Sequence, residues 1–408
     1  MRNRVLYIQL WNDLAPEKAM VMLSGPRQVG KTTFAQKLTG RGFPNKEYFN
    51  WDVIDNKKRL IQEPYFFEHI NLKDSSRPLV IFDEIHKYKH WKSYLKGVYD
   101  QYGERFKFLI LGSGRLDVSK KGGDALSGRF LEMHLFPFTI AELSSRHRDI
   151  HRFLTNPLSE FDLNPVKETF ELWQQLANVS GFPEPFIKGR VSSWRRWSSS
   201  YGRQIIRDDI RTVQEVRQTD TMEILYSLLP SRVASPLSLN NLAGDLQVSF
   251  ETVKQWLSLF DYFYLTFRIS PWSKKVSRTI LKEKKMYFFN VAMIDEEAVK
   301  FENMVALELW RAVHQWNEWG WGNFGIYYLR NKEKKEVDFI LTNNHKPILL
   351  IEAKFAEEHP SESLRYFQGI LKIPAVQLVN RENIRKILRN DQLEIGIFSA
   401  HQWLSSLP

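Results

Sequence analysis

The feature that most constrains this chain is a glycine-rich loop between an apolar run and a helical stretch. Residues 19–24 predict a buried strand before the loop, and residues 31–38 predict a helix after it. Backbone N–H groups in such a loop converge on phosphate oxygens, and the start of the helix adds partial positive charge. The loop fits G-x-x-x-x-G-K-[ST] at every defined position, with the residues Gly25, Pro26, Arg27, Gln28, Val29, Gly30, Lys31 and Thr32.

This loop predicts a site for a nucleoside triphosphate, most simply ATP, together with Mg²⁺. Lys31 is expected to reach the β- and γ-phosphates, and the Thr32 hydroxyl to hold Mg²⁺. Thr33, the next residue, completes the predicted nucleotide-binding set.

A second motif matches the first. The apolar run at residues 79–82 ends in two carboxylates, Asp83 and Glu84. Asp83 is expected to bind Mg²⁺ through water, and Glu84 to orient or deprotonate the attacking water. The two motifs together predict hydrolysis of the bound nucleotide.

Two further residues are candidates for the same site. Ser113 follows the apolar run at residues 106–111, where a polar side chain is expected to contact the γ-phosphate or the water. Arg129 precedes the run at residues 131–135 and is a candidate arginine finger, within its own chain or on a neighbouring subunit. An ordinary surface ion pair is an equally good interpretation of Arg129.

The first part of the chain predicts an α/β fold. Strands that alternate with helices form a parallel sheet with helices on both faces. The pattern ends at Phe136-Pro137-Phe138, and a nucleotide-binding domain is expected over residues 1–145. The predicted strands are residues 19–24, 48–53, 79–82, 106–111 and 131–135.

Charge and composition indicate which classes of partner and site are compatible with this chain. The net charge of +11 favours anionic partners, nucleic acid before acidic membranes, although a protein that is merely basic is as good an interpretation. The absence of cysteine excludes disulfides, thiolate metal sites and cysteine nucleophiles. No signal-peptide core is evident, and no apolar run approaches the roughly 20 residues of a membrane span. A cytoplasmic protein without a membrane partner is the simplest expectation.

The middle of the chain predicts helices and a DNA-binding element. A helical connector is expected over residues 146–230, with arginines and aromatic residues interleaved between residues 188 and 217. Residues 238–265 resemble a helix-turn-helix within a winged-helix-like domain at 231–285, and Ser249 or Thr252 is expected to cap its second helix. An ordinary helical hairpin is the alternative.

The last part predicts a cluster of carboxylates and a lysine. Asp338 enters one strand, and Glu352-Ala353-Lys354 ends the next, so Glu352 and Lys354 share a face. This arrangement resembles the D-x(n)-E-x-K pattern of PD-(D/E)XK nucleases, in which the preceding helix often carries another acid, here Glu302. Glu302, Asp338 and Glu352 would hold Mg²⁺, and Lys354 would position water. Charged residues flanking a solvated sheet are the alternative.

A family resemblance joins these parts. The segments GPRQVGKTT, LVIFDEIHK, ILGSGRLD and LSGRF…LFPFTIAE resemble AAA-superfamily ATPases of bacteria and archaea that carry a C-terminal domain of unknown function. The GFPEP loop, the YGRQIIRDDI helix, the helix-turn-helix and the C-terminal pattern are similar to that family as well. The resemblance covers nearly the whole chain. It implies an AAA-type core sheet, a winged-helix-like middle and a restriction-endonuclease-like domain over residues 286–408.

Two functions are compatible with the sequence. The first is an ATPase that acts on DNA, which the C-terminal domain binds or cuts. The second is a nucleotide-state switch or scaffold for a protein partner, in which the nuclease-like fold is inert. A homo-oligomer is expected if Arg129 acts on a neighbouring subunit.

Overall fold

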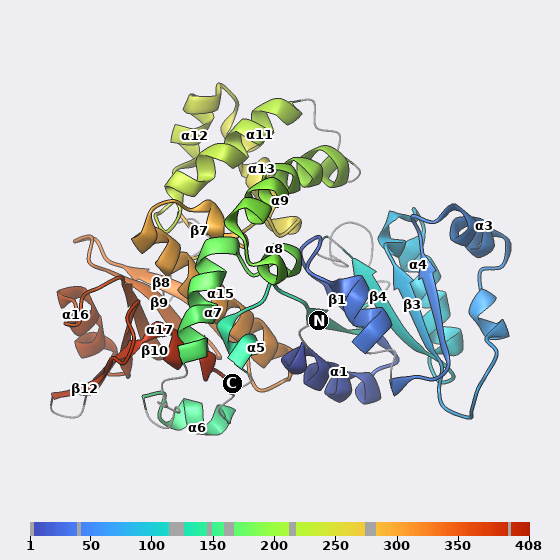
Figure 1. The fold of residues 1–408 in the computed structure, drawn as a ribbon, viewed down its shortest axis with the longest axis horizontal. Coiled ribbons are helices and arrows are strands. Elements are labelled where there is room, and N and C mark those ends of the chain that lie inside the picture. The colour runs from blue at the N-terminus through green and yellow to red at the C-terminus, as the bar shows by residue number, and fades with distance from the viewer. Residues whose placement is uncertain are drawn as a thin grey trace. The chain divides into compact units, whose positions relative to one another are not determined.

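The structure is a computed structural model, and it describes residues 4–38, 42–112, 114, 126–144, 149–158, 167–211, 218–273, 283–390 and 393–408. The chain divides into two compact units, Met1–Phe136 and Pro137–Pro408. The division falls at the Phe136-Pro137-Phe138 break, where the alternating pattern of the sequence ends. The first unit begins at the blue end of the ribbon's colour range, and the second unit ends at the red end (Figure 1).

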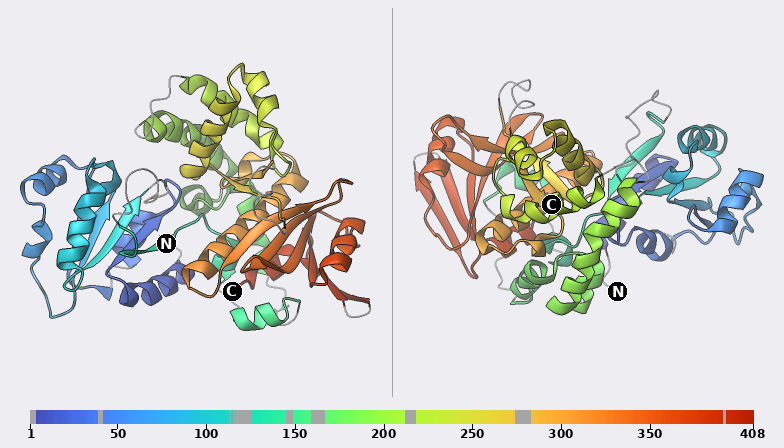
Figure 2. Two further views of the ribbon diagram at one scale, coloured as in Figure 1. Left: turned by 180° about the vertical axis from the view of Figure 1, so that it is seen from behind. Right: turned by 90° about the horizontal axis from the view of Figure 1, so that it is seen from above.

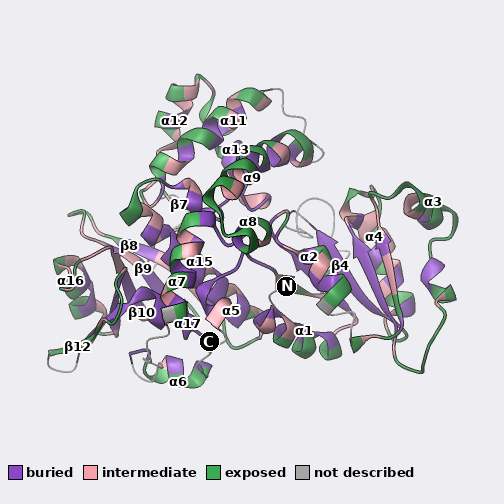
Figure 3. Cartoon of the chain, viewed as in Figure 1, coloured by how far each residue is buried: buried purple, intermediate pink, exposed green. Residues whose placement is uncertain are grey.

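The first unit is built on a parallel sheet of five strands in the order β2-β3-β4-β1-β5. Its strands β1, β3 and β4 are buried along their whole length, as the purple ribbons show (Figure 3). The elements of this unit are α1 (Val5–Glu17), β1 (Met20–Ser24), α2 (Lys31–Thr33), η1 (Phe34–Leu38), β2 (Lys46–Asn50), α3 (Ile54–Gln62), η3 (Phe66–His69), β3 (Leu79–Asp83), η4 (Ile85–Lys87), α4 (Trp91–Tyr102), β4 (Lys107–Gly112) and β5 (Phe130–His134).

The predicted parallel sheet is confirmed. Four of the five predicted strands lie within one residue of the observed bounds, because continuous apolar runs mark strands that are buried on both faces. The strand predicted at residues 48–53 is Lys46–Asn50 instead, and residues 51 and 52 form a turn. This strand lies at the edge of the sheet and is only partly buried, so its sequence carries a weaker apolar signal.

An aromatic cluster fills one side of this sheet. Phe82 on β3 packs edge-on against Phe49 of β2 and stacks with Phe108 of β4, at ring-centroid distances of 5.7 and 6.3 Å. Phe67 of η3 packs against the same group. Edge-to-face and offset contacts of this kind add stability beyond the area they bury. The cluster holds β3, and with it the end of β3, in a fixed position within the sheet.

The second unit begins with helices and ends with a mixed sheet. A short two-stranded sheet, β6 with β7, lies between the two parts in the chain. The helical part comprises α5 (Ile140–Ser144), α6 (Ile150–Thr155), α7 (Lys167–Val179), α8 (Pro183–Lys188), α9 (Val191–Gln204), η5 (Ile205–Ile210), α11 (Thr219–Leu228), η6 (Leu229–Arg232), α12 (Leu239–Leu246) and α13 (Phe250–Tyr262), which are followed by β6 (Thr266–Ile269) and β7 (Lys285–Phe288).

Two helices separated by a short turn, α12 and α13, lie within residues 238–265, where the sequence predicts a helix-turn-helix. Ser238 caps α12 and Ser249 caps α13, each through its side-chain oxygen, so the capping prediction is resolved in favour of Ser249. Gln247 takes the left-handed conformation that ends α12. Strand β6 follows α13 in the chain and forms an antiparallel pair with β7.

The C-terminal sheet has six strands in the order β12-β13-β11-β10-β9-β8. Helices α15 and α16 pack on opposite faces of it (Figures 1 and 2). The two strands that the sequence analysis places at Asp338 and at Glu352-Ala353-Lys354 are β9 and β10. The elements are η7 (Val291–Met293), α15 (Glu297–Glu318), β8 (Phe324–Arg330), β9 (Glu336–Asn343), β10 (Lys346–Lys354), α16 (Glu362–Leu371), β11 (Ala375–Val379), β12 (Arg385–Asn390), β13 (Leu393–Ser399) and α17 (Ala400–Ser405).

No helix in the described part of the chain combines the length and the apolar character that crossing a lipid bilayer requires.

A buried histidine predicts how the second unit responds to acid. His401 of α17 lies beside Phe170, and neither ring nitrogen has a hydrogen-bond partner among the described residues. Burial lowers the pKa of His401 from 6.5 to about 4. Between these values the unfolded chain binds a proton that the folded chain does not bind. The free energy of unfolding should therefore fall by up to about 1.4 kcal/mol per pH unit as the pH drops through this window.

The check is a series of urea denaturations between pH 7 and 4. Carboxylates also titrate in this range, so wild-type protein is compared with His401→Leu, which keeps an apolar side chain of similar size. The stability of the variant should fall less steeply with decreasing pH. Parallel curves for the two proteins would show that His401 contributes nothing to the acid response.

Candidate functional site

The glycine-rich loop lies between β1 and α2, as its pattern predicts. Gly25 has a φ of +151°, and a Cβ atom there would lie 2.1 Å from the carbonyl oxygen of Leu135. Gly30 has a φ of +98° and stands directly before α2. Neither position accommodates a larger residue without strain, so both glycines are required by the shape of the loop. The backbone N–H groups of the loop therefore lie beside the N-terminus of α2, where phosphate oxygens can bind.

Two cationic side chains brace this loop. Lys31 is buried, and its Nζ donates to the carbonyl oxygens of Gly25 and Pro26, both at 2.8 Å. Arg4, just before α1, donates to the carbonyl oxygen of Val29 at 3.1 Å and also to that of Phe136. The sequence predicts the role of Lys31, but the role of Arg4 escapes it because Arg4 belongs to no motif.

The two motifs meet at Asp83. The sheet order places β4 between β1 and β3, so the ends of all three strands lie along one edge. There the Thr32 Oγ1 donates to Asp83 Oδ2 at 2.7 Å, and the Tyr48 hydroxyl donates to the same oxygen at 2.8 Å. Burial raises the pKa of Asp83, and these two hydrogen bonds oppose that rise. A hydroxyl and a carboxylate in direct contact are oxygen ligands that Mg²⁺ accepts, so the residues present fit the predicted ion.

Glu84 follows in a left-handed backbone conformation, with a φ of +54°. Its Oε2 lies 3.2 Å from Lys87 Nζ and 3.5 Å from His86 Nε2. Burial lowers the pKa of His86, which makes Lys87 the permanent cation that faces Glu84. Lys87 also contacts Asp52 at 2.6 Å, so one ammonium group ties the glutamate to the loop after β2.

The remaining two candidates have different outcomes. Ser113 lies outside the described residues. Arg129 forms a two-point pair with Asp100, with its Nε 2.7 Å from Oδ1. Because β1 and β5 pair with Met20 opposite Phe130, Arg129 lies where the strands begin, roughly 15 Å from the loop at their other end. It does not reach its own phosphate loop, and the ion pair fits the alternative interpretation. Action on a neighbouring subunit stays a prediction.

The C-terminal acids form a cluster around a lysine that the motif does not contain. Lys285 of β7 is buried, and its Nζ lies 2.6 Å from Glu336, 3.1 Å from Glu302 and 3.4 Å from Asp338. The Tyr287 hydroxyl donates to Glu302 at 2.8 Å. Burial, and then the neighbouring charge of Asp338, raise the pKa of Glu302 to about 7. In the sequence, Lys285 is only the last member of a basic run.

The E-x-K residues lie next to this cluster. Glu352 is buried and accepts a hydrogen bond from the Ser361 hydroxyl at 2.6 Å, while its other oxygen lies 3.3 Å from Lys354 Nζ. Asp338 accepts from the backbone N–H of Ala353 at 2.9 Å. The structure therefore brings Asp338, Glu352 and Lys354 together as predicted. Among the described residues, however, no three acidic or histidine side chains are grouped as ligands of a metal ion. The arrangement does not support the predicted ligand role of Glu302, Asp338 and Glu352.

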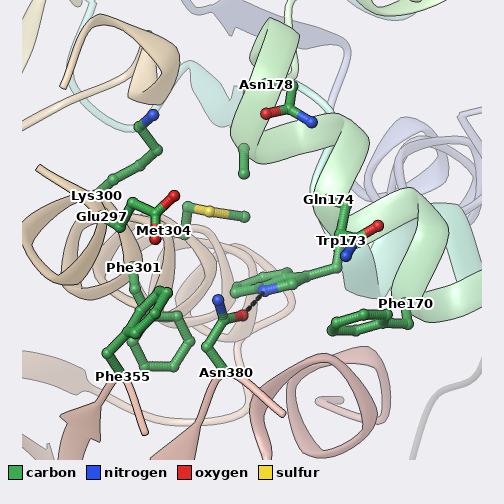
Figure 4. Close-up of a pocket in the computed structure, with 11 residues that line it drawn as sticks. Phe170, Trp173, Gln174, Asn178, Glu297, Lys300, Phe301, Met304, Phe355 and Asn380 are labelled. Atoms are coloured by element: carbon green, nitrogen blue, oxygen red, sulfur yellow. Dashed lines mark hydrogen bonds between the residues drawn. The ribbon is translucent and has the colours of Figure 1, made fainter. Parts of the chain in front are cut away.

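A pocket of about 410 Å³ opens beside the ends of β10 and β11 (Figure 4). Phe301, Phe355 and Met304 contribute apolar surface, and Trp173 donates its indole N–H to Asn380 at 2.8 Å. This volume is in the usual range of small-molecule pockets. No motif indicates the pocket, because its lining comes from α7, α15 and two strand ends that are far apart in the sequence.

Comparisons with known families divide the chain into three parts. Residues 17–144 match the family described as AAA domain, which spans β1 to β5 and both motifs. Residues 170–298 match a domain of unknown function (DUF8612), and residues 300–397 match another (DUF4143). The sheet, the phosphate loop and the first match together support an AAA-type ATPase domain, which implies nucleotide binding.

Individual relatives are distant. An uncharacterized protein of Mycobacterium tuberculosis is 21% identical over 289 residues, which cover 71% of this chain and 58% of the relative. An uncharacterized protein of Methanocaldococcus jannaschii is 22% identical over 297 residues, which cover 67% and 61%. The chain thus spans about six tenths of the length of the curated relatives that it matches.

Similar solved structures include a Walker-type ATPase of Pyrococcus abyssi, with a TM-score of 0.45 and 14% identity over 72% of this chain and 95% of that one. Another is the Aeropyrum pernix ORC1 protein in complex with DNA, with a TM-score of 0.33 and 13% identity over 75% and 93%. Likenesses at these TM-scores support no inference about function.

The contact between Lys87 and Glu84 yields a prediction. Lys87→Ala should lower the kcat of ATP hydrolysis about tenfold, because the carboxylate loses the ammonium group that fixes it, with little change in KM. Lys87→Arg should restore most of the rate. Lys89→Ala, a change of an exposed lysine two residues away, serves as the control. Equal rates for Lys87→Ala and the control would contradict a positioning role for Lys87.

Proposed function

We propose that this chain is a Mg²⁺-dependent ATPase whose nucleotide state is coupled to DNA binding by its second unit. The observation that carries the ATPase part is the hydrogen bond of 2.7 Å between Thr32 and Asp83, with Glu84 directly after Asp83. A phosphate loop, oxygen ligands for Mg²⁺ and a carboxylate for water are the parts that transfer of a phosphoryl group to water requires.

Each residue has a defined task in this proposal. Lys31 exchanges its bonds with the carbonyl oxygens of Gly25 and Pro26 for bonds with phosphate oxygens, while the backbone N–H groups hold the remaining oxygens. When bound, Mg²⁺ supplies positive charge that neutralises the β- and γ-phosphates. Thr32 and Asp83 are its proposed ligands, and Asp83 acts through water. Glu84 orients the attacking water or accepts its proton.

DNA binding is supported by the net charge of +11 and by an exposed basic stretch. Arg190, Arg195 and Arg196, at the start of α9 and within it, are exposed and form no ion pair with another described residue. Two aromatic residues of α9 follow these arginines in the sequence. Trp197 and Tyr201 are buried and stack on each other at 4.5 Å, so they pack the core and present no surface for stacking bases. The proposed contact is therefore with phosphates.

The winged-helix-like segment contributes less charge than its outline suggests. On the exposed face of α13, Lys254 lies 3.3 Å from Glu251, so the two charges offset each other. We assign α12 and α13 mainly to packing and α9 to the DNA contact. The proposed domains remain residues 1–145, 146–230, 231–285 and 286–408. The order α15, β8, β9, β10, α16, β11, with Glu352 and Lys354 ending β10, supports a restriction-endonuclease-like fold for the last domain.

Two substitutions separate nucleotide binding from hydrolysis. Lys31→Ala should abolish tight ATP binding, because the loop loses the cation that is proposed to bind the β- and γ-phosphates. Glu84→Gln should retain binding and lower turnover by a factor of about 10² or more. Equilibrium binding of a fluorescent ATP analogue and release of inorganic phosphate provide the two measurements. Unchanged turnover in Glu84→Gln would refute the role assigned to Glu84.

A further prediction concerns the basic stretch. The double variant Arg195→Ala/Arg196→Ala should bind duplex DNA several-fold more weakly. Its slope of log K against log salt should become shallower by about 0.9 for each phosphate that the variant no longer neutralises. Arg207→Ala is the matched control, because Arg207 already pairs with Asp220 at 2.9 Å and also with Glu223. Absence of binding by wild-type protein at low salt would favour the alternative, a nucleotide switch that acts on a protein partner.

A further inference from the structure

The acidic cluster of the C-terminal sheet already contains a cation, the ammonium group of Lys285. An ammonium group has three N–H donors, and here three carboxylates surround it, from Glu336, Glu302 and Asp338 at 2.6, 3.1 and 3.4 Å. A Mg²⁺ ion bound by the same oxygens would lie about 2.1 Å from each. It would then occupy nearly the same space as the ammonium group, and the two positive charges would repel each other.

Lys285 is fixed in this position by the backbone around it. Its strand β7 pairs with β6, where Lys285 lies opposite Ile269. On the other side Lys285 forms a bridge with Pro236, and only 1% of its side chain is exposed. The pairing fixes the backbone of Lys285, and burial among the three carboxylates holds its ammonium group. The ammonium group is therefore a permanent part of the cluster.

The neighbouring carboxylates have donors of their own. Asp338 directs one oxygen to Lys285 and accepts from the N–H of Ala353 with the other. Glu352 accepts from Ser361 with one oxygen, and its other oxygen faces Lys354. Arg330 lies 3.3 Å from Glu336. Three cationic side chains thus face four carboxylates, and little negative charge remains for a divalent ion.

We propose that Lys285 takes the place of the divalent ion in this cluster, so that the nuclease-like domain holds its acids together without metal and does not cut DNA by metal-assisted hydrolysis. In this proposal Glu302, Glu336 and Asp338 are the counter-ions of a buried lysine. The domain keeps the fold and the E-x-K residues, and the chemistry that remains to it is binding. The proposal does not depend on the ATPase activity or on the DNA contact at α9.

The test is Mn²⁺ binding to the full chain without nucleotide or DNA, measured by electron paramagnetic resonance. Lys31→Ala serves as the parent, so that the phosphate loop retains no bound nucleotide that would carry metal. The parent should bind no Mn²⁺ at the cluster. Adding Lys285→Met should create one Mn²⁺ site and make Tm rise with Mn²⁺, because the three carboxylates then lack their cation. Adding Glu302→Gln should abolish this new site, and Lys285→Arg should bind none.

A Mn²⁺ site in the parent that disappears when Asp338→Asn is added would overturn the proposal. That comparison leaves Lys285 in place and remains decisive if Lys285→Met does not fold. Mg²⁺-dependent nicking of plasmid DNA by wild-type protein that is abolished in Lys354→Ala would overturn it as well. Neither experiment requires ATP turnover, so failure here is distinguishable from failure of the proposed ATPase function.

Discussion

The hydrogen bond between the Thr32 hydroxyl and Asp83 is the interaction on which the nucleotide site depends. It joins two motifs that are 51 residues apart in the sequence, and it forms only because β4 separates β1 from β3 and aligns the ends of the three strands. The aromatic cluster around Phe82 fixes β3 in that alignment. The glycine conformations at Gly25 and Gly30 bring the loop to the same edge. Packing in the core therefore sets the distance between Thr32 and Asp83, on which the proposed nucleotide chemistry depends.

Both units contain a carboxylate at the end of a strand or near it, but the partners of the two carboxylates differ. In the first unit, Asp83 is held by hydroxyl groups of Thr32 and Tyr48, which are neutral and able to share an oxygen with a metal ion. In the second unit, Asp338 faces the ammonium group of Lys285. A carboxylate with neutral partners retains a charge that a divalent ion can neutralise, whereas a carboxylate paired with a buried lysine has already been neutralised. In the proposals made above, the position of one cation separates a metal site from an ion-pair cluster.

The sequence predicts the strands and motifs well where the signal is local. Apolar runs identify β1, β3 and β4 because these strands are buried on both faces. Contacts that join distant segments are not predictable in this way. Tyr48, Arg4 and Lys285 belong to no motif, and each contacts partners in other segments of the chain that only the fold brings close.

Two other expectations from the sequence differ from the structure because they depend on how distant segments pack. The order of the chain suggests Arg129 as an arginine finger, but parallel pairing places it at the far end of the strand. The aromatic residues of α9 alternate with arginines in the sequence, and helical periodicity turns Trp197 and Tyr201 into the core.

The measurement that tests the coupled function most directly is ATP turnover as a function of duplex DNA concentration at low salt. Turnover should rise and saturate over the same DNA concentrations as binding. A rate that stays constant while DNA binding is saturated would contradict coupling between the two units.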